Sequence, residues 1–213
     1  MLKRSRGWNR TCLAILVAAW GSCVGSLLAQ NTESTEESTQ DSLWRSFLGS
    51  SAVGLELAKG SSEIESVKVF VQSHWSRAWL DEGRWLLTGY WEIDYARWET
   101  ARPPKEPDVG PFDSTELIGF SPVFRLVQKR IFSRQTKAYL EGSVGVHYLQ
   151  DTMIGDRNVS SNFQFGDHLG LGVIFGRNSQ FDLSYRLQHF SNGGVESPNP
   201  GLDFHAFRLA MYF

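Results

Sequence analysis

The sequence predicts an all-β protein, an eight-stranded antiparallel β-barrel that spans an outer membrane. About eight segments alternate apolar and polar side chains, and most reach the ten residues that a tilted strand needs to cross a bilayer. An export signal precedes them, and no apolar run elsewhere approaches the roughly 18–20 residues of a membrane helix. The alternative is a soluble sandwich or lipocalin-like barrel, whose strands would usually be nearer five or six residues long.

The chain begins with the pattern of a secretory signal peptide. Four basic residues within 3–10 precede the short apolar run 13–20, and residues 27–29 offer a cleavage site. A lipoprotein signal through Cys23 fits less well, because Trp20 stands where a small aliphatic residue is expected. We therefore expect the protein to be exported and to reach the outer membrane.

Composition agrees with an exported chain and excludes several classes of site. Both cysteines, Cys12 and Cys23, lie in the signal peptide, so the mature chain can hold neither a disulfide nor a Cys-ligated metal. The net charge is −2, and removal of the basic signal peptide makes it four units more negative, which argues against a nucleic-acid partner. We expect a signal peptide at 1–29, a polar leader with a short turn at 30–50, and the barrel domain at 51–213. No cofactor and no metal are expected.

The leader and the strands follow in order along the chain. Residues 30–42 contain no apolar side chain and form a solvated leader, while residues 43–48 either form a short helical turn or extend it. Residues 102–113 contain four prolines and are expected to be irregular. The alternating pattern places strands at 53–59, 67–75, 85–98, 115–128, 137–148, 163–175, 180–191 and 202–213. Pro122 predicts a bulge or kink in the fourth of these strands.

Each strand has one apolar and one polar face, and in a membrane barrel these faces meet lipid and fill the lumen, respectively. The segment 85–95 shows this most clearly. Its lipid face would carry Trp85, Leu87, Trp91, Ile93 and Tyr95, and its lumen face Thr88, Tyr90, Glu92 and Asp94. On the lumen face of the last two strands, Arg186 and Arg208 should pair with Glu92, Asp94 or Glu141. Four tryptophans near strand ends predict an interfacial girdle: Trp75, Trp79, Trp85 and Trp98.

The last two strands carry the three residue types of a serine hydrolase on the apolar face. His189 and Ser191 are two residues apart, and Asp203 starts the next strand, across the hairpin. A carboxylate can orient the imidazole, which removes the serine proton for attack on an acyl carbon. Glu196 is a second candidate for the acid, but its parity is less favourable. The alternative without catalysis is that His189, Ser191 and Asp203 are ordinary polar residues at the membrane interface.

These segments closely resemble the lipid A 3-O-deacylase (PagL) family of outer-membrane enzymes. The resemblance rests on residues 165–172 (FGDHLGLG), 184–194 (SYRLQHFSNGG) and 199–203 (NPGLD), within roughly 135–213. It implies an eight-stranded barrel that hydrolyses the ester-linked acyl chain at the 3-position of lipid A in lipopolysaccharide.

The resemblance also implies roles for individual residues. His189 would be the base and Ser191 the nucleophile, and Asp203 stands where the family usually has glutamate, one methylene longer. The residues that stabilise the oxyanion and orient the substrate would be Asn192, Gly193, Gly194 and Asn199.

Two other functions remain open from the sequence. One is a non-catalytic barrel with a structural or adhesive role, and the other is an acyl hydrolase of a different membrane lipid. A homodimer is compatible with the sequence but not indicated by it. The remaining histidines are less telling: His74, His147 and His168 are expected on different strands as lumen or rim residues, and His205 as an interfacial residue that could contact a lipid head group.

Overall fold

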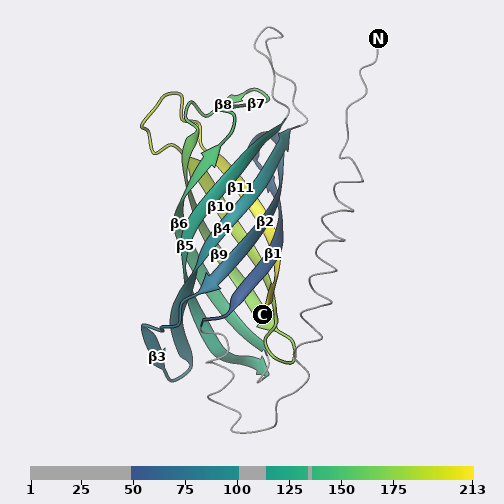
Figure 1. The fold of residues 1–213 in the computed structure, drawn as a ribbon, viewed down its shortest axis with the longest axis vertical. Coiled ribbons are helices and arrows are strands. Elements are labelled where there is room, and N and C mark those ends of the chain that lie inside the picture. Colours follow the sequence, from purple (N-terminus) through teal and green to yellow (C-terminus); the bar gives the residue numbers. More distant parts are fainter. Residues whose placement is uncertain (1–48, 101–113, 134–135) are drawn as a thin grey trace, which may run out of the picture. The chain divides into compact units, whose positions relative to one another are not determined.

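The computed structural model describes residues 49–100, 114–133 and 136–213. In these residues, eight long strands form a closed antiparallel barrel (Figure 1). They are β1 (Ser51–Gly60), β2 (Ile64–His74), β4 (Trp85–Thr100), β5 (Ser114–Ser133), β6 (Thr136–Leu149), β9 (Phe163–Phe175), β10 (Phe181–Ser191) and β11 (Leu202–Tyr212). Each strand pairs with the next one along the chain, and β1 pairs with β11 to close the ring. The predicted barrel is confirmed; the signal peptide and the leader lie outside the described residues.

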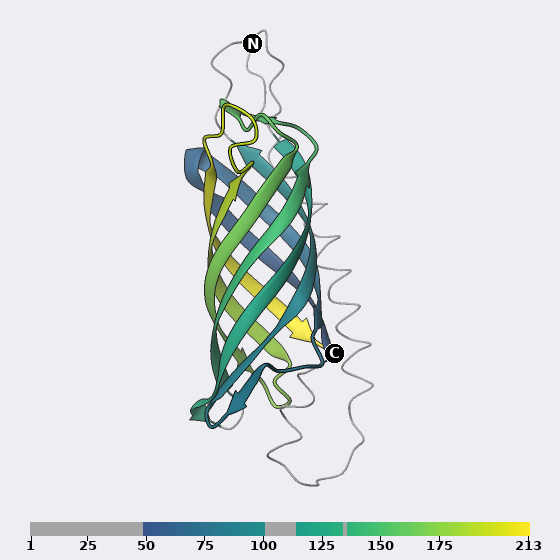
Figure 2. The same ribbon diagram turned by 90° about the vertical axis from the view of Figure 1, so that its left-hand side faces the viewer.

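Three short strands and one turn complete the connections. β3 (Leu80–Glu82) pairs with the start of β4, β7 (Met153–Ile154) pairs with β8 (Arg157–Asn158), and the 3-10 turn η1 (Ser61–Glu63) joins β1 to β2. β3 and the C-terminus lie at the same end of the barrel, which we call the terminal end (Figure 1). The opposite end, which we call the loop end, carries β7, β8 and the connection from β10 to β11 (Figures 1 and 2). Across the described segments, no helix is both long and apolar enough to cross a membrane.

The barrel is apolar outside and polar inside, as the alternation predicts. On β4, Trp91, Ile93 and Tyr95 are 45%, 57% and 46% exposed, whereas Glu92 and Asp94 between them are 2% exposed. A soluble sandwich would bury the apolar face and solvate the polar one, which is the opposite arrangement. The inverted distribution is the one that a lipid-embedded barrel requires.

A network of buried ion pairs fills the middle of the lumen, with Glu141 at its centre. Glu141 accepts hydrogen bonds from the guanidinium groups of Arg125 and Arg186, both at 2.7 Å. Arg186 also reaches Glu92 at 3.1 Å, and Arg208 reaches Glu92 at 2.5 Å. These contacts confirm the predicted pairing of the two lumen arginines. The paired charges satisfy one another in a space that excludes most water, and they tie together strands that are not neighbours.

An apolar plug closes the lumen at the loop end. It consists of Ile64, Ala96, Trp98, Leu117, Leu149, Ile154, Val159, Phe190, Leu202 and Phe204, all buried. Trp98 therefore does not belong to the interfacial girdle, and that expectation was wrong. Its even-numbered position on β4 directs it inward, where its ring packs against Phe190 and Phe204. On the outer surface Trp75 instead packs edge-on against Trp79.

The expectation at Pro122 was a bulge or a kink, and the structure contradicts the bulge, although the ladder with β6 skips Ser121 and Pro122. Pro122 is opposite Trp91 on β4, and the register between β5 and β6 is the same on both sides of it. The carbonyl of Pro122 accepts a hydrogen bond from the Ser143 hydroxyl at 2.7 Å, so this backbone acceptor has a partner on the β6 side. The register shift falls farther along β5, between Gln128 and Ser133.

Candidate active site

The hairpin of β10 and β11 brings His189 and Asp203 together on the outside of the barrel. The two residues are directly paired in the antiparallel register, and both side chains point away from the lumen. His189 Nδ1 lies 2.7 Å from Asp203 Oδ1. Such a contact orients the ring and leaves Nε2 to act on a neighbouring group. The carboxylate in contact with the histidine is thus Asp203; the Glu196 side chain has no described contact with it.

Ser191 ends β10 and shares the outward face of His189. Same-face neighbours on a strand are roughly 6–7 Å apart between Cα atoms, which is within reach of their side chains. Within the described residues, the Ser191 hydroxyl makes no hydrogen bond to His189. Nucleophile and base are often too far apart for a hydrogen bond before substrate binds. The structure therefore brings His189 and Asp203 into contact and places Ser191 beside them.

The loop after Ser191 is braced by Asn192, whose side chain points inward and is 2% exposed. Its amide nitrogen donates to the carbonyls of Val159 (3.2 Å) and Glu196 (3.0 Å), and its amide oxygen accepts from the Gly194 N–H (2.9 Å). The Asn192 N–H donates to Asn199 Oδ1 at 3.2 Å. Asn192 and Gly194 thus use these donors to hold the loop.

Two donors near Ser191 remain unengaged among the described groups. They are the N–H of Gly193, which has φ +66, and the side-chain nitrogen of Asn199. The hydrogen bond from Asn192 to Asn199 Oδ1 fixes the orientation of the Asn199 amide. Of the four expected oxyanion residues, Gly193 and Asn199 are therefore the ones with a donor to offer.

Gly201 lies close to the Cε1 edge of the His189 ring. A Cβ atom built on Gly201 would lie 2.7 Å from His189 Cε1 and 3.4 Å from Nε2, and the residue has φ +63. Only glycine fits so close to the ring without displacing it and adopts this positive φ without backbone strain. The sequence analysis did not single out this residue. The Pro200-Gly201 pair marks a turn, but no sequence pattern shows that the imidazole packs on it.

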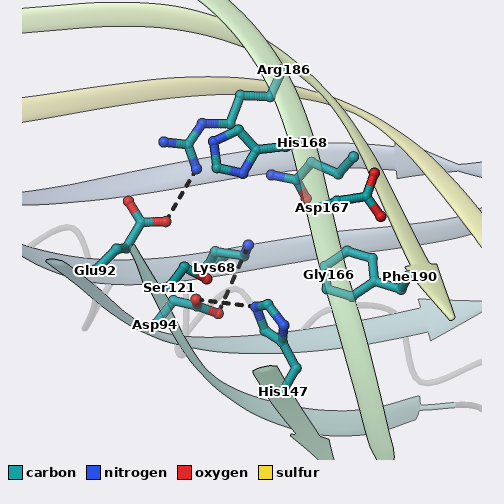
Figure 3. A pocket seen from close by; sticks show the side chains of 11 residues that line it. Lys68, Glu92, Asp94, Ser121, His147, Gly166, Asp167, His168, Arg186 and Phe190 are labelled. Carbon is teal, nitrogen blue, oxygen red and sulfur yellow. Dashed lines mark hydrogen bonds and ion pairs between the residues drawn. The ribbon is translucent and has the colours of Figure 1, made fainter. Parts of the chain in front are cut away.

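The three buried histidines belong to the lumen. His147 and His168 line a small polar cavity, together with Lys68, Glu92, Asp94, Ser121, Gly166, Asp167, Arg186, Gln188 and Phe190 (Figure 3). In it, Asp94 lies 3.8 Å from Lys68 and 3.5 Å from His147. His74 packs on the rings of Tyr90 and Tyr212. None of His189, Ser191 and Asp203 lines this cavity, so the candidate active site is on the outer surface.

Comparison with known proteins decides the family. A family model described as lipid A 3-O-deacylase (PagL) matches residues 65–212, more than half of the chain. The chain belongs to the PagL family. The lipid A deacylase PagL of Pseudomonas aeruginosa is 29% identical over 132 residues, which cover 62% of this chain and 69% of that protein. The lipid A deacylase PagL of Bordetella bronchiseptica is 43% identical over 65 residues, which cover 30% and 35%.

A solved structure supports the fold of this PagL family member. The crystal structure of the outer membrane enzyme PagL superposes with a TM-score of 0.64 at 24% identity, and covers 75% of this chain and 97% of that chain. This likeness confirms the eight-stranded barrel and, with the relatives, a location in the bacterial outer membrane. The resemblance seen in the sequence is thereby confirmed, and the family description is that of an acyl hydrolase.

Proposed function

We propose that this PagL family member is a lipid A 3-O-deacylase that uses Ser191, His189 and Asp203. The observation that carries the proposal is the 2.7 Å contact between His189 and Asp203 on the lipid-facing side of the barrel, one same-face step from Ser191. A lysine or arginine on the lipid-facing surface is unfavourable by about 2–4 kcal/mol near the midplane, an acidic residue by less, and either by much less at the interface. Three of them gathered at the edge of the apolar surface fit a site for an amphiphilic ester.

Each residue has a defined part in the reaction. Asp203 accepts the Nδ1 proton of His189 in a hydrogen bond, so that Nε2 is free to take the proton of the Ser191 hydroxyl. The serine oxygen attacks the acyl carbon at the 3-position, and the Gly193 N–H and the Asn199 amide stabilise the oxyanion. His189 returns the proton to the sugar oxygen as the ester bond breaks. Water, activated by the same imidazole, then hydrolyses the acyl-enzyme and releases the fatty acid.

The surroundings of the site fit an acyl chain. Directly beside His189 on β9 lies the exposed Asp167, and one same-face step farther from the loop end the outer surface of β9 and β10 becomes apolar. Leu169, Leu171 and Leu187 there are 73%, 57% and 50% exposed. A chain leaving the ester can lie along this surface without meeting water. We also propose that the protein is exported through the signal peptide 1–29 and that the loop end faces the cell exterior, where lipid A is found.

Mass spectrometry of lipid A tests this function. Cells that produce the protein in the outer membrane should yield lipid A lighter by one ester-linked acyl chain at the 3-position, compared with cells carrying an empty vector. An unchanged acyl pattern, with the folded protein present in the outer membrane, would contradict the proposal. Loss of an acyl chain from phospholipid instead would transfer the activity to another lipid class.

Gly201→Ala should lower the rate of deacylation by about 10²-fold, because a Cβ would displace the His189 ring from its position. The measurement is acyl-chain release by purified protein in detergent. Gly83→Ala is the matched control: Gly83 also has positive φ (+54), but no atom lies within 4 Å of its Cβ position. Both variants carry the left-handed backbone strain of about 1–2 kcal/mol. If both retained full activity, Gly201 would not position the histidine.

A further inference from the structure

Three outward-facing side chains form a second polar cluster beside the candidate active site. We call it the rim cluster; it consists of Lys59 on β1, Tyr185 on β10 and His205 on β11. Lys59 and His205 are directly paired in the antiparallel register of β1 and β11. The Tyr185 hydroxyl lies 2.5 Å from His205 Nδ1. The side chains of such a cross-strand pair have Cβ atoms about 4.5–5.5 Å apart, so both can contact one ligand group.

The rim cluster has hydrogen-bond donors that no described group uses. Lys59 is exposed and makes no ion pair within the described segments, although Glu65 is opposite it on β2. His205 has a contact at Nδ1 alone among those residues. In the tautomer that accepts the Tyr185 hydroxyl proton at Nδ1, the imidazole carries its own proton on Nε2 and has an N–H donor for a ligand. A cation and an N–H donor thus face the same region from neighbouring strands.

The rim cluster adjoins the candidate active site. His205 and Asp203 are same-face neighbours on β11, which places them roughly 6–7 Å apart between Cα atoms. At the end of β1, the Ser61 hydroxyl accepts a hydrogen bond from the Asp203 N–H at 3.3 Å. A ligand group held by Lys59 and His205 would therefore be separated from the reacting ester by no more than about the width of one sugar ring.

We propose that Lys59 and His205 form a subsite for a phosphate group of the glycolipid substrate, with Tyr185 orienting the imidazole. This inference rests on the proposed function and adds to it the group that selects the substrate. A phosphate offers several acceptor oxygens and a negative charge, which match an ammonium point charge beside an N–H donor. Two-point recognition, phosphate and ester, would fix the 3-position next to Ser191.

Binding to a catalytically blocked protein tests the subsite without requiring turnover. Full-length Ser191→Ala protein in detergent micelles is titrated with bisphosphorylated lipid A and with the same lipid after chemical dephosphorylation. Lys59→Ala and His205→Ala, each added to this background, should weaken binding of the phosphorylated lipid by about tenfold. Binding of the dephosphorylated lipid should not change. Tyr185→Phe should cause a smaller, equally selective loss, because it removes only the group that orients the ring.

Arg177→Ala is the control, since Arg177 is an exposed cation in the turn between β9 and β10 at the terminal end. It should leave both affinities unchanged. Equal losses for the two lipids in the Lys59 and His205 variants, or no loss at all, would overturn the subsite. Phosphatidylglycerol is also tested as a competitor of phosphorylated lipid A. If its binding is weakened by Lys59→Ala as much as that of lipid A, the ligand is the phosphate of a bulk lipid, and a role of the subsite in substrate choice is overturned. Acyl release by the protein with Ser191 intact is measured separately, so failure of the proposed activity and failure of the subsite give different results.

Discussion

Replacement of Ser191 by alanine should abolish release of the 3-linked acyl chain, with a loss of at least about 10³-fold in rate. The hydroxyl is the atom that attacks the ester in the proposed mechanism, and alanine leaves His189 and Asp203 in contact with no nucleophile to activate. Ser191 is at the outer end of β10, where its side chain takes no part in the lumen network or the apolar plug. The barrel should therefore fold normally. Mass spectrometry of lipid A gives the activity, and heat-modifiable migration on gels gives the fold.

Two substitutions at Asp203 provide the matched comparison. Asp203→Asn keeps the size of the side chain but loses the carboxylate that orients His189, so activity should fall by about 10⁴-fold. Asp203→Glu restores the residue that is usual in the PagL family and should retain activity. A Ser191→Ala protein that deacylates lipid A at the wild-type rate would refute the assignment of the nucleophile. Equal activity of the Asn and Glu variants would remove Asp203 from the mechanism.

Glu141→Ala should destabilise the barrel by about 3–5 kcal/mol, the largest stability effect that we expect for a single lumen residue. Glu141 is 4% exposed, and its two carboxylate oxygens bind Arg125 and Arg186 at 2.7 Å. Its removal leaves two buried guanidinium groups with less compensation in a space that holds little water. The free energy of unfolding is measured by denaturant titration of the protein reconstituted in lipid vesicles.

The exposed ion pair of Arg97 and Glu99 is the control for this prediction. Its atoms are also 2.7 Å apart, but the side chains are 48% and 28% exposed. Glu99→Ala should therefore change the free energy of unfolding by no more than about 1 kcal/mol, because water and salt screen the pair. A Glu141→Ala variant as stable as the wild type would mean that the lumen network rearranges around the lost carboxylate.

The outcomes at Trp98 and Pro122 have different physical causes. Closeness to a strand end indicates an interfacial site for Trp98, but its even-numbered position on β4 directs the ring into the lumen, where Phe190 and Phe204 cover it. The two-residue period of the strand therefore outweighs the position along it. At Pro122 the register between β5 and β6 continues unchanged, and the Ser143 hydroxyl of β6 donates to the Pro122 carbonyl. That contact comes from the neighbouring strand and could not be read from the residues around Pro122.

The alternation of apolar and polar residues was enough to predict the eight strands, the face of most residues, and the candidates His189, Ser191 and Asp203. These follow from local properties, because side-chain direction in a strand has a period of two residues and the apolar face must meet lipid. Which groups touch depends on the three-dimensional arrangement of the strands and loops. The hairpin register sets the contact of His189 with Asp203, the loop packing turns Asn192 inward, and Gly201 lies at the Cε1 edge of the imidazole. These contacts depend on register and loop conformation, which join residues far apart in the chain and leave no periodic trace in it.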